Sequence, residues 1–284
     1  MRPTGRLHLG NYHGALRNWV ELQYQYECFF FVADWHMLTT GYDETAHLQE
    51  HVHEVLIDWL AAGLNPGVAT LFIQSHVPEH AELQWLLATI APLGALERAQ
   101  ALVHSNNRIT VADRERLLGF LEGTGVTILP EPQVLLTATP KVPGLDGRKM
   151  SKSYGNTIGL REEPEQVAQK LRAMKTDPAR VRRTDPGDPD KCPVWDLHQI
   201  YSDEATRKWA SEGCRSAGIG CLDCKQPVID KIVEEINGMR RRAQEYEDNP
   251  ELVRGIVAEG ADKAREAARE TLDEVRRAMH LRPD

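Results

Sequence analysis

The stretch Gly144-Leu145-Asp146-Gly147-Arg148-Lys149-Met150-Ser151-Lys152-Ser153-Tyr154-Gly155-Asn156, called the lysine loop below, decides how the rest of the sequence is interpreted. It follows an apolar run at 134–138 that is typical of a buried strand. Lys149 and Lys152 supply two compact positive charges on a segment whose glycines permit close backbone approach to an anion. The stretch therefore predicts a phosphate-binding loop, although a solvated basic turn would explain the two lysines alone.

The composition is that of a globular protein. The chain has 284 residues, of which 41% are hydrophobic and 27% charged, enough for one large or two modest domains. No apolar run reaches membrane-spanning length, and the N-terminus lacks the apolar core of a signal peptide. We therefore expect a cytoplasmic location and no membrane contact.

The net charge of −8 argues against a general nucleic-acid-binding surface but leaves room for a local one. Two basic segments could provide it, the longer from Lys170 to Lys191 and the shorter at Arg240-Arg241-Arg242. A solvated helix face explains either segment as well as RNA contact does.

The N-terminal segment has the pattern of a loop that leads from a strand into a helix. Proline and glycine mark its turns, and the apolar spacing from Tyr12 to Gln25 predicts a helix. A helix N-terminus behind such a loop presents unpaired N–H groups to a phosphate or ribose. His8-Leu9-Gly10-Asn11 is therefore a second candidate for nucleotide contact, although so short a motif also recurs by chance.

Together, the two candidate segments resemble the signatures of class I aminoacyl-tRNA synthetases. Lys149-Met150-Ser151-Lys152-Ser153 matches the mobile ATP-phosphate loop of that class, and His8-Leu9-Gly10-Asn11 precedes it in the same order. The resemblance predicts a few more residues before Met1. It implies that four residues act in catalysis: His8, Asn11, Lys149 and Lys152. It further implies ATP contacts from Arg2, Thr4, Gly10, Met150 and Ser151.

The order of apolar runs predicts an α/β fold. Two runs, Cys28–Asp34 and Ala69–Ser75, have the length of buried parallel strands, and helical patterns follow at Asp43–Ala62 and Ala81–Ala91. Thr45 is a candidate cap for the first of these helices. A β-α-β-α-β order is typical of a doubly wound, Rossmann-like parallel sheet that binds a nucleotide.

The segment Trp35-His36-Met37-Leu38-Thr39-Thr40 resembles the corresponding part of tryptophanyl-tRNA synthetases. It follows the first predicted strand at its carboxyl end, where open α/β sheets bind ligands. The equivalent histidine lines the amino-acid pocket in that family. The resemblance therefore implies pocket roles for Asp34 and His36, whereas a lone histidine at such a place is otherwise most often structural.

The resemblance is weak at residues 99–129. Tryptophanyl-tRNA synthetases normally carry a longer segment there, with an Asp that binds the indole N–H and a Gly-Glu-Asp-Gln turn that helps hold substrate and organise the dimer; neither is found in this sequence. A buried indole N–H without an acceptor costs about 1–3 kcal/mol. Selective tryptophan binding therefore depends on what replaces this segment. A sequence fault or internal deletion, a diverged paralogue, or a pocket completed by other residues would each explain the difference.

The C-terminal part has helical patterns. An acidic start and Pro164 predict a helix at Glu162–Met174, and the turn-rich Asp185–Asp190 marks a boundary. We expect an ATP and amino-acid domain at 1–184 and a helical tRNA-binding domain at 185–284. Helices are predicted in the second domain at 194–202, 203–213, 225–247, 249–257 and 260–280.

Four cysteines of the C-terminal part are close in sequence: Cys192, Cys214, Cys221 and Cys224. A metal site explains them better than disulfides do, because no secretory signal is present. Zinc ribbons usually contain two close cysteine pairs, and this set contains one. The set is similar to that of a subset of tryptophanyl-tRNA synthetases with a [4Fe–4S] cluster, which implies a structural cluster and leaves zinc as the alternative.

Outside residues 99–129, the resemblance covers nearly the whole chain. It implies a homodimeric tryptophan–tRNA ligase that uses ATP with Mg²⁺, L-tryptophan and tRNA(Trp). Two other classes stay open: a paralogue that binds ATP or RNA without activating tryptophan, and an iron–sulfur redox-sensing module on the same scaffold.

Overall fold

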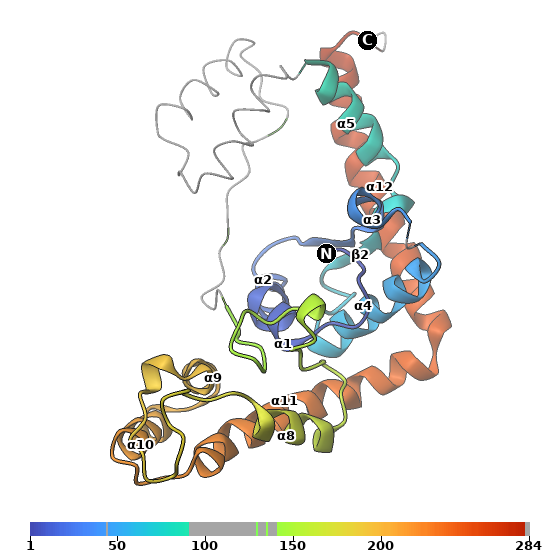
Figure 1. Cartoon of the computed structure of the whole chain (residues 1–284). Helices are drawn as coiled ribbons and strands as arrows, with labels where there is room; N and C mark the ends of the chain where they lie inside the picture. Colours follow the sequence, from blue (N-terminus) through green and yellow to red (C-terminus); the bar gives the residue numbers. More distant parts are fainter. Residues whose placement is uncertain (44, 91–128, 130–134, 136–140, 282–284) are drawn as a thin grey trace. The chain divides into compact units, whose positions relative to one another are not determined.

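A computed structural model describes residues 1–43, 45–90, 129, 135 and 141–281 (Figure 1). The weakly matching segment and the predicted strand at 134–138 lie almost entirely outside these residues. Contacts divide the chain into two units, the first made of residues 1–73 and 136–260, the second of 74–135 and 261–284. The boundary expected between residues 184 and 185 falls inside the first unit, and it stays a prediction.

The sheet of the first unit is parallel. Strand β1 (Phe29–Val32) pairs with β2 (Thr70–Ile73), the two strands that the structure describes. Helices α3 (Asp34–Gly41) and α4 (Leu48–Ala62) lie between them in the chain, as a parallel pair requires. Both strands and their parallel pairing were predicted, but β1 is less buried than expected, since Phe29 is 38% exposed.

The N-terminal helical segment begins earlier than its apolar spacing predicts. It consists of α1 (Leu9–Asn11), a π-helical turn η1 (Tyr12–Leu16) and α2 (Arg17–Leu22). The helix predicted at Tyr12–Gln25 is therefore confirmed in its main part. The start at Leu9 places the glycine and asparagine of the His-Leu-Gly-Asn motif inside the first helical turn.

Helix α4 is the central buried element of the first unit. Every residue from Val55 to Ala62 is buried, which is typical of a helix covered on all sides, and the long helix α11 (Cys221–Asp248) packs against it. The prediction of a cap at Thr45 is wrong. The carbonyl of Thr45 instead closes a turn with the N–H of Leu48, and the helix starts there.

The lysine loop leads through a short 3-10 helix η4 (Lys152–Tyr154) to helix α8 (Pro164–Ala173). The proline occupies the first helical position, where its missing N–H costs nothing. The helix predicted at Glu162–Met174 is thus confirmed.

The C-terminal helices of the first unit lie around α11. A short 3-10 helix η5 (Pro189–Lys191) precedes α9 (Pro193–Tyr201) and α10 (Glu204–Arg215). Helices α8, α9 and α10 all contact α11, beside which Figure 1 shows them. The four helices predicted between residues 162 and 247 are therefore present.

The prediction of two helices at 249–257 and 260–280 is wrong. Helix α12 (Pro250–Ala278) runs through both ranges without a break. Gly260, at the start of the second predicted range, is needed for packing: a Cβ there would lie 1.9 Å from the carbonyl oxygen of Leu71.

The second unit contains η2 (Gln74–His76), helix α5 (Glu79–Ile90) and the last part of α12. Ion pairs join the two helices: Arg269 with Glu79 at 2.9 Å, and Arg276 with Glu82 at 2.5 Å. Helix α5 confirms the helix predicted at 81–91 as far as residue 90. None of the helices in the described ranges has the length and apolar composition to cross a membrane.

The close approach at Gly260 gives a matched test. We expect Gly260→Ala to lower the free energy of unfolding by about 1–3 kcal/mol or more, because the new methyl overlaps a backbone carbonyl. Gly255→Ala in the same helix meets nothing within 4 Å and should stabilise by about 0.5–1 kcal/mol. Urea unfolding of both variants measures the difference; equal effects would contradict the packing.

Candidate active site

A short antiparallel contact brings the two candidate nucleotide segments together. The N–H of Leu9 donates to the carbonyl of Ile158 at 3.0 Å, and the N–H of Leu160 donates to the carbonyl of Leu7 at 3.1 Å. All four side chains are at most 2% exposed, and they flank His8, which lies opposite Gly159. Burial of the flanking side chains fixes the register, since a one-residue shift would expose them.

His8 is buried and neutral at physiological pH. Burial, followed by the charges of Lys152 and Lys149, lowers its pKa to about 4, which places both lysines near the imidazole. Its Nδ1 atom has no hydrogen-bond partner within the described part of the chain. Gly10 lies against the ring, where a Cβ would be 2.9 Å from Nδ1. The side chain of Asn11 accepts the His8 N–H at 3.1 Å and fixes the turn.

Asn156 organises the lysine loop from inside. Its Oδ1 accepts the N–H of Ser151 at 2.8 Å, and its Nδ2 donates to Asp146 Oδ1 at 2.7 Å and to the Lys149 carbonyl at 3.2 Å. The hydrogen bond from Asn156 is the first cause of an Asp146 pKa near 2. A Cβ at Gly144 would be 2.2 Å from Asn156 Nδ2, so only glycine fits beside this buried amide.

Lys152 contacts the N-terminal loop directly. Its Nζ donates to the carbonyls of Thr4 at 2.7 Å and Gly5 at 2.8 Å, with Thr4 Oγ1 at 3.3 Å. Ser151 has its hydroxyl 2.9 Å from that of Ser153. Met150 is only 3% exposed and donates its N–H to Val142, so its side chain holds the loop to the core. The ammonium of Lys152 is therefore placed beside the His8 motif.

The predicted amino-acid pocket residues lie where the chain leaves β1. Asp34 is the first residue of α3 and is 5% exposed. His36 is the third residue of the same helix and is exposed. Arg2 reaches the far end of α3, donating to Thr40 Oγ1 at 3.0 Å. The structure thus places Arg2, Asp34 and His36 on one helix or against it.

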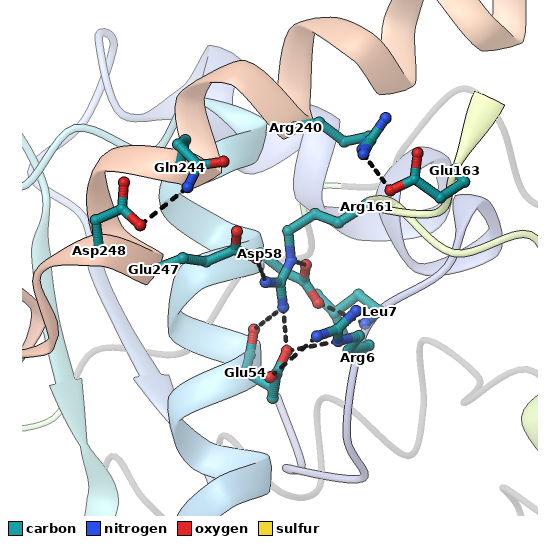
Figure 2. A network of polar contacts seen from close by, with 10 residues as sticks. All are labelled: Arg6, Leu7, Glu54, Asp58, Arg161, Glu163, Arg240, Gln244, Glu247 and Asp248. Atoms are coloured by element: carbon teal, nitrogen blue, oxygen red, sulfur yellow. Dashed lines mark hydrogen bonds and ion pairs between the residues drawn. The ribbon is translucent and has the colours of Figure 1, made fainter.

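Two residues of the site, Asp58 and Arg161, were not predicted (Figure 2). Asp58 on α4 accepts the N–H of Leu7 at 2.6 Å and the Nε–H of Arg161 at 2.7 Å. The Arg161 side chain, 3% exposed, also forms ion pairs with Glu54 and Glu247. An acid inside the apolar run of α4 is the one sequence feature that could have indicated this cluster.

A second polar contact joins the N-terminal segment to the C-terminal helices, and it too was not predicted. His13 Nε2 lies 2.6 Å from the Tyr201 hydroxyl, which donates to Glu235 at 2.9 Å. These residues come from η1, α9 and α11. Because they are far apart in the chain, no spacing in the sequence relates them.

The four cysteines lie at the ends of three helices. Cys192 precedes α9, Cys214 is near the end of α10, and Cys221 and Cys224 are in the first turn of α11. Burial, then the neighbouring Cys192, Cys214 and Cys221, raises the pKa of Cys224 to about 12. The thiols are thus near one another, yet in the described residues no three His, Cys, Asp or Glu side chains are arranged to hold a metal ion.

The two basic segments are engaged with the protein itself. Arg240 pairs with Glu163, and Arg242 Nε donates to the carbonyl of Ala61 at 2.6 Å. In the longer segment, Arg180 is 8% exposed and donates to the carbonyl of Ile219 at 2.5 Å. These arginines are structural at least in part. An open groove of about 890 Å³ next to Arg240 contains both arginines and glutamates, so it has no single charge sign.

Comparison with known proteins agrees with this geometry. The sequence model of the family described as tRNA synthetases class I (W and Y) matches residues 1–121 and 112–236. A tryptophan–tRNA ligase of Ralstonia nicotianae is 46% identical over an alignment of 388 residues that covers 99% of this chain and 97% of the relative. One of Thermotoga maritima is 40% identical over 321 residues, with coverage of 99% and 98%.

Solved structures show the same fold. A tryptophanyl-tRNA synthetase from Campylobacter jejuni, complexed with ADP and tryptophan, has a TM-score of 0.79 at 24% identity and covers 99% of this chain and 98% of its own. One from Mycoplasma pneumoniae has a TM-score of 0.74 at 22% identity, with coverage of 100% and 97%. The chain belongs to the class I tRNA synthetases of the tryptophan and tyrosine family, in its tryptophanyl branch.

Proposed function

We propose that this chain is a tryptophan–tRNA ligase. In the first step the tryptophan carboxylate attacks the α-phosphorus of ATP, and the bond from that phosphorus to pyrophosphate breaks, which gives the tryptophanyl adenylate. In the second step the adenylate passes its aminoacyl group to a tRNA hydroxyl, and AMP leaves. The contact that supports this most directly is that of Lys152 with Thr4 and Gly5, because it joins the two nucleotide segments. The proposal is also supported by the relatives, which are named tryptophan–tRNA ligases.

Catalysis in this proposal is positioning and charge stabilisation rather than covalent chemistry. The Gly10 backbone and the uncharged ring of His8 face the nucleotide, in the turn that Asn11 fixes, and Arg2 and Thr4 lie on the same loop. Lys149 and Lys152 neutralise the phosphates, helped by the Ser151 hydroxyl, and Mg²⁺ enters with the triphosphate. The buried Nδ1 of His8, which has no partner among the residues that the structure describes, supports a ligand contact there.

The amino-acid pocket is proposed at Asp34 and His36, with part of the family's central segment missing. The 388-residue alignment is longer than the 284-residue chain, so the Ralstonia relative contains residues with no counterpart here. The two family matches overlap at 112–121, which supports a break inside residues 99–129. The indole N–H partner is left unassigned for this reason.

That missing segment is also what favours the alternative function, a paralogue that binds ATP or RNA without activating tryptophan. Tryptophan-dependent exchange of pyrophosphate into ATP separates the two. We expect exchange with tryptophan and none with tyrosine. Protein that binds ATP but shows no exchange would establish the paralogue instead.

We further propose that the four cysteines hold a [4Fe–4S] cluster with a structural role. Four cysteines are a suitable set of ligands, since cysteine thiolates usually hold such clusters. Four thiolates also leave no open position for a substrate, which agrees with a structural role. A cluster of several irons accepts sulfur atoms that lie further apart than those around one zinc ion. At Gly187 a Cβ would be 2.6 Å from Cys214 Sγ, so the chain leaves room at that sulfur. A redox-sensing role is the less favoured alternative.

The partners follow from the same proposal. They are L-tryptophan, tRNA(Trp) docking on the helical part from residue 185 onward, and a second copy of the chain. The homodimer rests on the family resemblance, and light scattering of the purified chain tests it. A cytoplasmic location stays a prediction.

Replacing the proposed phosphate-binding lysine separates catalysis from folding. We expect Lys152→Ala to slow tryptophan-dependent pyrophosphate exchange about 100-fold, because one charge opposite the phosphates is lost. Tryptophan binding, measured by equilibrium dialysis, should change little. Lys231→Ala, which breaks an exposed ion pair with Glu234, is the control and should stay within about twofold. Equal exchange in Lys152→Ala and the unmodified chain would refute the assignment.

The cluster is tested by its iron and colour. Anaerobically purified chain should be brown, with iron and acid-labile sulfide in equal amounts. Cys214→Ser should lose both, whereas Cys28→Ser, whose cysteine directly precedes β1 and is not one of the four, should keep them. Colourless anaerobic protein that contains zinc would contradict the cluster and establish the zinc site.

A further inference from the structure

Asp58 is shared by both nucleotide segments. One carboxylate oxygen accepts the N–H of Leu7, which precedes His8, at 2.6 Å. The other accepts from Arg161, which follows the paired segment that leaves the lysine loop, at 2.7 Å. Asp58 is 1% exposed, so no water competes for these two hydrogen bonds.

The helix that carries Asp58 is packed on all sides at this point. Every residue of α4 from Val55 to Ala62 is buried, and the packed helix fixes the direction of the carboxylate. Behind it, Arg161 is held from two further sides by Glu54 of α4 and Glu247 of α11 (Figure 2). Asp58 is the member of this cluster whose carboxylate also accepts the backbone N–H next to His8.

We propose that Asp58 is a positioning residue for amino-acid activation, which sets the placement of His8 relative to Lys152 through the Leu7 N–H and the Arg161 side chain. It is not proposed to touch substrate; it acts through these two groups, and its negative charge also acts on Lys152. The assignment deepens the proposed function and rests on it, because His8 and Lys152 are its nucleotide-binding groups.

Glu54 provides a matched control. It pairs with the same guanidinium and lies one helical turn before Asp58, but its other partner is Arg6, at 2.9 Å, and not the N–H of Leu7. Loss of either negative charge weakens the hold on Arg161. Only loss at Asp58 also disturbs the backbone next to His8.

In Asp58→Asn, the amide cannot accept from both Leu7 and Arg161, because one of its two polar atoms is a donor. We expect kcat for tryptophan-dependent exchange to fall at least about tenfold, since a small misplacement of reacting groups is costly. The KM for tryptophan should stay unchanged. Glu54→Gln should remain within about twofold of the unmodified chain in kcat.

A double variant separates positioning from stability. Replacing a buried ion pair by apolar residues of similar volume is often neutral for stability, so Asp58→Leu with Arg161→Met is expected to fold. This variant still lacks the acceptor for Leu7. Exchange that stays at least about tenfold slow at normal thermal stability supports positioning, and exchange restored together with stability would overturn it.

Binding of Mg²⁺-ATP, measured by equilibrium dialysis, keeps the test independent of tryptophan activation. If the unmodified chain shows no exchange, the proposed function fails, and the affinity for Mg²⁺-ATP then tests Asp58 alone. A dissociation constant at least about tenfold weaker in Asp58→Asn than in Glu54→Gln supports the assignment. Equal constants in the two variants overturn it.

Discussion

Two backbone hydrogen bonds, from Leu9 to Ile158 and from Leu160 to Leu7, are the contacts on which the proposed site depends. They join segments that are separated by more than half of the chain. The entropic cost of closing so long a loop grows only slowly with its length, so a few well-buried side chains can offset it. Burial of the two leucines and of Ile158 and Leu160 supplies that stabilisation, and the buried Asp58 fixes the pair to α4. The motif that contains His8 and the loop that contains Lys152 are thereby held on one support.

The fold could be predicted where local pattern decides it. The apolar runs of β1 and β2 and the proline at the start of α8 gave correct elements, because burial and capping act over a few residues. The break predicted between residues 257 and 260 was wrong, because α12 continues through it. Gly260 permits close approach to the Leu71 carbonyl, which only tertiary structure shows.

The candidate site was predictable to the extent that it is formed by contiguous motifs. The sequence contains both class I signatures, which predicted that Lys152 lies near the His8 motif. In the structure Lys152 contacts Thr4 of the loop that precedes this motif. Asp58, Arg161 and Asn156 were missed because each acts through a partner far away or inside a loop, and single polar residues in apolar runs have many explanations. The four cysteines lie at the ends of three helices, and two of these helices, α9 and α11, contribute Tyr201 and Glu235 from other positions to the contact with His13.

The central claim is that the two nucleotide segments form one cooperative unit, and native-state hydrogen exchange of the Leu9 and Leu160 amides tests it most directly. Each amide donates across the pair, so both should open with one shared free energy. Addition of Mg²⁺-ATP should raise that free energy equally for both, because a ligand that binds only the closed unit stabilises all of it. Leu160 exchanging independently of Leu9, or protection that rises with nucleotide at one amide and not the other, would contradict the claim.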